Sequence, residues 1–428
     1  MLQAVSSALR LPDLRQKLLF TFAMLVVFRF IAHVPVPGID PAALERLFQS
    51  NALLGMFDLF SGGAMRNFSI AAMGVYPYIT ASIIMQLLTP IIPQLQNLQK
   101  EGESGRNRIN MYTHWLTVPL AALQGYGQLL ILSSQGAISG FGLSGETLLP
   151  TIAMVASLTA GTILLVWIGE LITENGIGNG VSIIIFGGIV ANLPQIVGQG
   201  FLSLNNIVGV AVFGLLGIGT VYAIVIFNEA QRRIPVQYAR RVRGTKVYGG
   251  QSTHIPLRVN SAGMIPLIFA MSIVIFPGVV ASWFMYGNSG WISDVARTVY
   301  SVFDASGWVY WLLYFTLVVG FTFFYTMVIF EQQRLSENLQ KYGGFVPGIR
   351  PGRPTSLYLN KVLLRITWAG ALFLGIVAVL PFFARTGTGV QALQLSSTGL
   401  LIIVGVVLDM MRQLEAQLLM RHYEGFIK

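Results

Sequence analysis

Ten stretches of mostly apolar residues recur along the chain, and they constrain its fold more than any other feature. A helix of about 20 apolar residues crosses the hydrocarbon core of a bilayer. Only 10% of the 428 residues are charged, whereas soluble domains carry about 25%. The sequence therefore predicts an all-α polytopic membrane protein with ten transmembrane helices. The predicted spans are at about 18–35, 69–92, 115–134, 148–172, 181–198, 206–228, 262–285, 307–330, 364–384 and 397–413.

Basic residues are distributed unevenly between the two sides of the predicted membrane. If both termini lie on one side, that side collects 22 of the 27 lysines and arginines. The others are Arg29 within the first span and, on the opposite side, Arg46, Arg66, Arg297 and Arg385. Because cytoplasmic loops are enriched in basic residues, we expect both termini in the cytoplasm.

Ten spans divide evenly into two groups of five. An odd number of spans in each group inverts one group relative to the other, as in many transporters. We therefore expect an N-terminal half at residues 1–200, with spans one to five, and a C-terminal half at 201–428, with spans six to ten. The predicted relation between them is an inverted pseudo-symmetry.

The sequence offers little for enzyme chemistry. It has no cysteine, and its four histidines lie too far apart for metal-ligand spacing. The HExxH, GxxxxGK[ST] and GxSxG motifs are missing. We expect no catalytic residue, metal site or cofactor, and any ATP-driven work must come from a partner.

Two cytoplasmic loops have the composition of docking elements. The loop at about 229–261 contains QYARRVRGTKVYGG, in which valines and cations alternate around a Gly-Thr pair, a pattern typical of a β-hairpin. The loop at about 331–363 contains KYGGFVPGIRPGRPTS, whose glycines and prolines exclude long regular elements. Each loop is either a topology signal or flexible linker, or a docking site for an anionic partner such as ribosomal RNA. The docking candidates are Arg240, Arg241, Arg243, Lys246 and Arg350.

A glycine-containing segment, LFSGGAMRNFSI at about 59–70, precedes the second span. It is too short and too polar to cross a membrane, and Gly62-Gly63 interrupts any long helix. It is either a re-entrant segment inside the protein or an interfacial turn on the outer side. Arg29 and Asp409 are charged residues within predicted spans. Arg29 either snorkels or pairs inside the bundle, and Asp409 is expected to pair or snorkel near the cytoplasmic interface.

A series of linked motifs resembles the bacterial SecY family, the channel subunits of the general protein translocase. The motifs are FSGGAMRNFSIAAMGVYPYITASIIMQLL, KEGESGRNRI, ITENGIGNGVSIIIFGGIVANLP, QRRIPVQYARR, VYGGQSTHIPLRVNSAGMIPLIFA, YGGFVPGIRPGRPT and GLLIIVGVVLD. They run in order through nearly the whole chain, and the outer loops at about 135–147 and 286–304 resemble the family least. The resemblance implies two five-helix halves around a central pore, which opens sideways between spans two to three and seven to eight.

The resemblance also implies a plug and a ring of apolar side chains at the waist of the pore. The plug, a short helix at about 56–67, would include Leu59, Phe60, Ser61, Gly62, Gly63, Ala64, Met65 and Arg66. The pore ring would be Val75, Ile79, Val181, Ile185, Ile268 and Ile402. The family often has isoleucine at all six ring positions, so the two valines predict a slightly wider seal.

The implied function is the central channel of the Sec translocon in a bacterial inner membrane. It would pass unfolded secretory polypeptides across the membrane and release hydrophobic segments sideways into lipid. The implied partners are SecE, SecG, the SecA ATPase, the ribosome with its RNA, signal peptides, precursor polypeptides and membrane lipids. The family commonly has two basic residues after the hairpin glycine, where this chain has Thr245 and Lys246.

The residues alone also allow a multi-span secondary transporter for a small solute. Ion coupling in such a transporter requires ionisable residues inside the membrane, and the spans offer little beyond Arg29 and Asp409. A membrane-bound enzyme is the weakest alternative because the sequence has no clustered acids or histidines.

Overall fold

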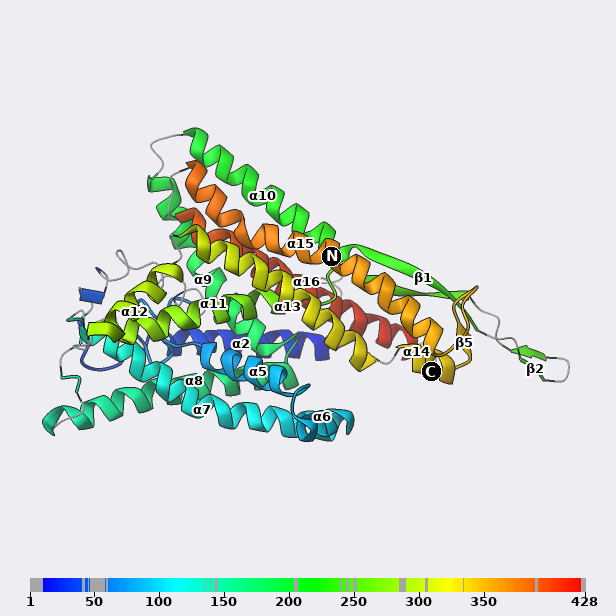
Figure 1. Cartoon of the computed structure of the whole chain (residues 1–428), viewed down its shortest axis with the longest axis horizontal. Coiled ribbons are helices and arrows are strands. Elements are labelled where there is room, and N and C mark those ends of the chain that lie inside the picture. Colours follow the sequence, from blue (N-terminus) through cyan, green and yellow to red (C-terminus); the bar gives the residue numbers. More distant parts are fainter. Residues whose placement is uncertain are drawn as a thin grey trace.

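The structure is a computed structural model in which helices form a bundle and a few strands extend from one end of it (Figure 1). It describes residues 11–40, 43–44, 46, 58, 61–134, 136–138, 140–142, 145–203, 207–238, 241–243, 246–248, 252–284, 290–304, 307–333, 335–388 and 392–424.

One described helix overlaps each of the ten predicted spans, in the predicted order. These helices are α2 (Pro12–Ile31), α5 (Tyr76–Leu88), α7 (Glu103–Ser134), α8 (Leu148–Asn175), α9 (Gly180–Ser203), α10 (Ile207–Glu229), α11 (Ile265–Phe284), α13 (Trp308–Gln333), α15 (Arg353–Thr388) and α16 (Ala392–Glu424). The ends of α7, α15 and α16 extend well beyond the predicted spans into polar sequence. Apolar composition marks the part of a helix that suits lipid, whereas backbone hydrogen bonds continue wherever helical geometry is tolerated.

The second predicted span, 69–92, is where the helix differs most from the prediction. Residues 69–75 form turns, with a positive φ of 56° at Gly74, and α5 begins only at Tyr76. Beyond Leu88 the chain bends by 97° into the short helix α6 (Pro93–Lys100). Prolines at 90 and 93 explain the bend, because proline removes a backbone donor and restricts the residue before it.

Five described helices, α7, α8, α11, α13 and α15, are long and apolar enough to cross a membrane, and the bent pair of α5 and α6 counts as a sixth. The described parts of α9 and α10 contain shorter apolar segments, Gly180–Pro194 and Gly217–Glu229. Helix α2 carries three cations, Arg15, Lys17 and Arg29, within its 20 residues.

The helices pack in two groups that follow the chain order. In the first group α2 contacts α8 and α9, α5 contacts α7, and α8 contacts α7 and α9. In the second, α13 contacts α11 and α15, and α16 contacts α10 and α15. The groups meet where α9 contacts α16 and, elsewhere, where α5 and α7 contact α11. The remaining described helices are α12 (Gly290–Val302), α14 (Leu335–Lys341) and the 3-10 turn Gly145–Thr147.

A small antiparallel sheet joins the two basic loops, and its strands extend from one end of the bundle (Figure 1). The strands are β1 (Gln231–Tyr238), β4 (Ser252–Arg258) and β5 (Gly344–Phe345), in the order β4-β1-β5. Residue Gln237 faces Ser252 on one side and Phe345 on the other. A second hairpin, β2 (Arg241–Arg243) with β3 (Lys246–Tyr248), lies beyond the sheet. The predicted hairpin is confirmed, and the second loop is attached to its base.

An apolar cluster beneath this sheet holds the two loops together. Its buried members are Ile234, Val236, Leu257, Leu339, Val346 and Leu359. They come from β1, β4, the 331–363 loop and the start of α15, so burial of their side chains removes apolar surface of both loops from water. The 331–363 loop is therefore a packed element rather than a flexible linker.

Candidate functional site

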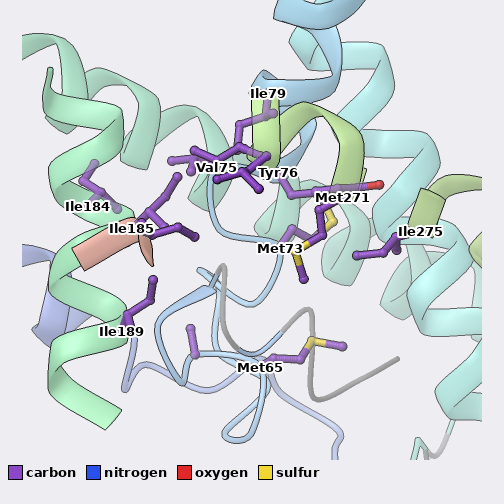
Figure 2. Packing of buried hydrophobic residues seen from close by; sticks show 14 of the residues in the cluster. Met65, Met73, Val75, Tyr76, Ile79, Ile184, Ile185, Ile189, Met271 and Ile275 are labelled. Atoms are coloured by element: carbon purple, nitrogen blue, oxygen red, sulfur yellow. The ribbon is translucent and has the colours of Figure 1, made fainter. Parts of the chain in front are cut away.

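The six predicted ring residues all belong to the largest apolar cluster among the described residues. They come from the start of α5 (Val75, Ile79), the start of α9 (Val181, Ile185), α11 (Ile268) and α16 (Ile402). Five of them are at most 6% exposed, and Val181 is partly buried against the same cluster. Figure 2 shows Val75 and Ile79 near Ile185, with Met65 lower in the view. Branched side chains from four helices thus belong to one apolar cluster.

The start of α9 is fixed by close backbone packing. A Cβ added to Gly180 would lie 1.7 Å from the carbonyl oxygen of Gly169, so only glycine lets α9 begin directly against α8. The Oδ1 of Asn179 accepts a hydrogen bond from the Ser182 N–H at 3.2 Å, which caps the helix. The start of α9 thus combines a side-chain cap with a close backbone contact.

The glycine-containing segment before α5 lies inside the protein. Ser61, Gly62, Gly63, Ala64 and Met65 are buried, and Arg66 is exposed. Its described part consists mainly of turns, with φ of 69° and 84° at the two glycines. Of the predicted plug residues, Leu59 and Phe60 lie outside the described residues. The described part of the segment therefore lies inside the protein, as the re-entrant alternative predicts.

Close contacts with α2 and α9 hold this segment in place. A Cβ on Gly188 of α9 would lie 2.4 Å from the Cα of Gly62, so the two backbones touch. The Nη1 of Arg29 in α2 donates a hydrogen bond of 2.7 Å to the Gly62 carbonyl oxygen. A Cβ on Gly63 would lie 2.7 Å from the Oδ1 of Asn192, also in α9. These contacts show that Arg29 pairs inside the bundle.

An ion pair closes the segment on itself. The Nε of Arg66 lies 2.9 Å from Oδ2 of Asp58, and the Arg66 N–H donates to Oδ1 at 3.2 Å. The Asp58 side chain is 6% exposed and the Arg66 side chain 39% exposed. The carboxylate of Asp58 therefore loses more of its hydration than the guanidinium of Arg66. Burial raises the pKa of Asp58, and the charges of Arg66 and Arg29 counteract only part of that rise.

Polar contacts connect α5 to α11 and α13, where the two helix groups meet. The hydroxyl of Tyr76 donates to the Ser272 carbonyl at 3.1 Å. The hydroxyl of Tyr325 donates to Oε1 of Gln86, whose Nε2 donates to Ser82 at 3.0 Å. Sequence analysis did not identify these bonds, because their partners are far apart in the chain and only the packing of the helices brings them together.

The predicted docking residues are distributed along the sheet and its tip. Arg241 and Arg243 lie on β2 and Lys246 on β3, with Arg243 opposite Lys246. Arg350 is exposed, and its carbonyl accepts a hydrogen bond of 2.8 Å from Thr355. The other candidate, Arg240, lies outside the described residues.

The C-terminal part of α16 contacts both helix groups. Asp409 lies 3.5 Å from Arg412, which confirms that this carboxylate is paired. The Nη2 of Arg412 donates to the Asn228 carbonyl near the end of α10 at 2.5 Å. The next residue, Gln413, accepts a bond of 2.7 Å from the Gly178 N–H in the loop before α9.

The sequence of this chain is similar to those of known proteins. The SecY family model matches residues 69–411. The protein translocase subunit SecY of Streptomyces galbus is 46% identical, with 100% of both chains covered, and that of Pseudomonas aeruginosa is 44% identical over 98% of this chain and 94% of its own. The chain belongs to the SecY family.

Solved structures similar to this SecY-family chain share its fold. One, described as a protein conducting channel, has a TM-score of 0.62 and 17% identity, with 94% of this chain and 92% of that one covered. Another, also with a TM-score of 0.62, is a study of the SecY plug domain, at 16% identity and the same coverages. A third is Sec61 in a canine ribosome–channel complex, with a TM-score of 0.57, 16% identity and the same coverages. The chain is thus a multi-pass membrane protein.

A larger residue in place of Gly188 is expected to displace the glycine-containing segment from its position against α9. Gly188→Ala puts a methyl group against the Gly62 backbone, which has no side chain to move aside. In this SecY-family chain we expect faster ion leakage through the resting protein in vesicles. Gly187→Ala is the matched control, because its methyl group meets only the movable end of the Leu25 side chain, 2.7 Å away. Equal leakage from the two variants contradicts the prediction.

The raised pKa of Asp58 predicts that the packing of its segment against α2 and α9 depends on pH. The buried carboxyl binds a proton more tightly than it would in water. The protonated acid therefore favours the packed position of the segment, fully so below the ordinary pKa of 3.8. This preference for the packed position is lost as the pH rises through the raised pKa of Asp58. We expect resting ion leakage to increase with the outer pH over this range, and to be flat in Asp58→Asn. The same pH profile in both proteins would exclude a role for Asp58.

The hydrogen bond between Tyr325 and Gln86 is expected to stabilise the contact between α5 and α13. Tyr325→Phe and Gln86→Ala each remove it, so their effects on unfolding free energy are predicted to be non-additive by about 0.5–1.5 kcal/mol. The measurement is a double-mutant cycle of reversible unfolding in mixed micelles. Strictly additive effects show that this bond contributes nothing.

Proposed function

We propose that this chain is the central protein-conducting channel of a Sec translocon. It passes unfolded polypeptides across the membrane and releases hydrophobic segments sideways into lipid. The observation that carries the proposal is one apolar cluster that contains branched side chains from four helices, with a buried, glycine-containing segment packed against it. Membership of the SecY family supports it.

The six ring residues are proposed to form the seal of the pore. A charged residue at the centre of a bilayer costs roughly 2.5–3.5 kcal/mol, so a secreted chain needs a hydrated path. A narrow apolar constriction excludes water and ions when it is empty, and it offers no polar partner to a passing chain. Valine and isoleucine have stiff χ1 angles, which keep the aperture defined. We propose that Ser61–Arg66, with the residues just before them, acts as the plug of this pore.

We propose that the two helix groups are the halves of the channel, at residues 1–200 and 201–428. The contacts of α5 and α7 with α11, and of Tyr325 with Gln86, lie on the side proposed to open toward lipid. The contact of α9 with α16, held by the bond from Gly178 to Gln413, is proposed to be the hinge. Weak polar bonds on the opening side are compatible with a gate that must separate and re-form.

The proposed location is a bacterial inner membrane with both termini in the cytoplasm. The 22 basic residues on the terminal side support this orientation. The proposed partners are SecE, SecG, the SecA ATPase, the ribosome, signal peptides and precursor polypeptides. The fold neighbour in a canine ribosome–channel complex supports the ribosome as a partner. We propose no catalytic activity for this chain, and SecA or the translating ribosome supplies the energy.

Transport of a secretory precursor tests the proposed function. The chain is reconstituted with SecE in vesicles and supplied with SecA, ATP and a precursor protein. We expect part of the precursor to become protected from added protease, and no protection when ATP is omitted. Uptake of a small solute, without any protected precursor, would overturn the proposal.

Reversing charge on the joined sheet tests the docking surface. Arg241→Glu with Arg243→Glu on the hairpin, and Arg350→Glu separately, are expected to weaken ribosome or SecA binding at least tenfold, since like charges repel an anionic partner. Binding of the parent protein should also weaken as salt increases. Arg297→Glu is the control, because this exposed arginine lies in α12 on the opposite predicted side. Unchanged affinity in the hairpin and Arg350 variants contradicts the docking role.

A further inference from the structure

Arg29 is a charged residue in a helix that otherwise consists largely of apolar side chains. An arginine in a membrane helix costs roughly 2.5–3.5 kcal/mol on insertion scales, and such residues persist where they find a partner or serve a function. In this protein the side chain is partly buried and its Nη1 donates to the Gly62 carbonyl at 2.7 Å. A membrane helix thus directs its cation at the backbone of the plug.

The plug backbone needs this donor. Gly62 is buried between Phe28 of α2 and Gly188 of α9. Neighbouring plug carbonyls accept backbone bonds, since Asp58 O receives the Gly63 N–H and Ala64 O receives the Ser69 N–H. Among the described residues, no backbone N–H outside regular helices donates to the Gly62 carbonyl. A buried carbonyl without a partner is costly, so the guanidinium satisfies a group that the turn leaves open.

The charge of Arg29 also acts on the plug acid. It lowers the pKa of Asp58, as does the closer Arg66, and both act against the effect of burial. The acid therefore lies near two cations, one on the plug and one on α2. Only the cation on α2 stays behind when the plug moves, so both the hydrogen bond and this attraction exist in the seated plug alone.

We propose that Arg29 is the positioning residue that seats the plug. The inference rests on the proposed function and adds to it the group that distinguishes the seated from the displaced plug. The apolar ring lacks directional bonds, whereas one charge-assisted bond at Gly62 fixes the plug at a single position on α2. The bond is short-range, so a displacement of a few ångströms releases it completely.

The chain has no cysteine, which allows a direct test of plug position. Met65 of the plug is 0% exposed, so Met65→Cys should react slowly with a membrane-impermeant maleimide added from the outer side. Adding Arg29→Ala should accelerate this reaction roughly tenfold or more, as expected for the loss of a charge-assisted bond. Arg29→Lys retains the charge and should restore part of the protection. Arg15→Ala, at the exposed cytoplasmic end of α2, is the matched control and should change nothing.

A second buried cysteine distinguishes displacement of the plug from unfolding of the whole protein. Leu158→Cys lies at a position that is 0% exposed, in α8 and next to Gly125 of α7, outside the plug segment. We expect Arg29→Ala to leave it protected. Equal labelling of Met65→Cys with and without Arg29 overturns the proposal, and so does simultaneous exposure of both cysteines, which would make Arg29 a general stabiliser. Labelling requires no transport, so it is independent of the precursor experiment.

Discussion

The structure depends on one constraint: a backbone polar group inside a membrane must find its partner within the protein. Helices meet this constraint by themselves, and so the described chain is mostly helical. The segment before α5 does not, because its glycines turn the backbone out of helical geometry. Several of its carbonyls and N–H groups are paired within its own turns, and Arg29 supplies the partner of Gly62. The close contacts with α2 and α9 enclose this irregular backbone inside the protein.

Extensive apolar packing and a few single hydrogen bonds join the helices, and this combination suits the proposed channel, which must close and open. The cluster that contains the six predicted ring residues is apolar, as the proposed seal requires. Polar bonds join other parts of the bundle, between Arg29 and Gly62, Tyr325 and Gln86, and Gly178 and Gln413. A typical protein hydrogen bond contributes about 1 kcal/mol, so each holds a position without making separation prohibitive. The buried acid Asp58 lowers the cost of release further, because its ionised form is better solvated in water.

The two basic loops combine a local sequence pattern with a long-range contact. Alternating valines and cations around a Gly-Thr pair predicted the hairpin, since this pattern is local. The pairing of Gln237 with Phe345 is between residues more than a hundred positions apart, and no local pattern indicates it. The apolar side chains of the second loop, such as Val346, had no assigned partner until the sheet and α15 were seen to cover them. The two loops thus form one surface.

The sequence by itself determined the class of the protein and the order of its helices. These follow from hydropathy and charge, which act on each segment independently through its transfer into the bilayer. The family motifs also indicated the ring residues. Only the tertiary structure decided how Gly62 touches Gly188, why α9 starts at Gly180 and which group Arg29 binds. Such contacts depend on the distance between two backbones, which packing sets and no single segment encodes.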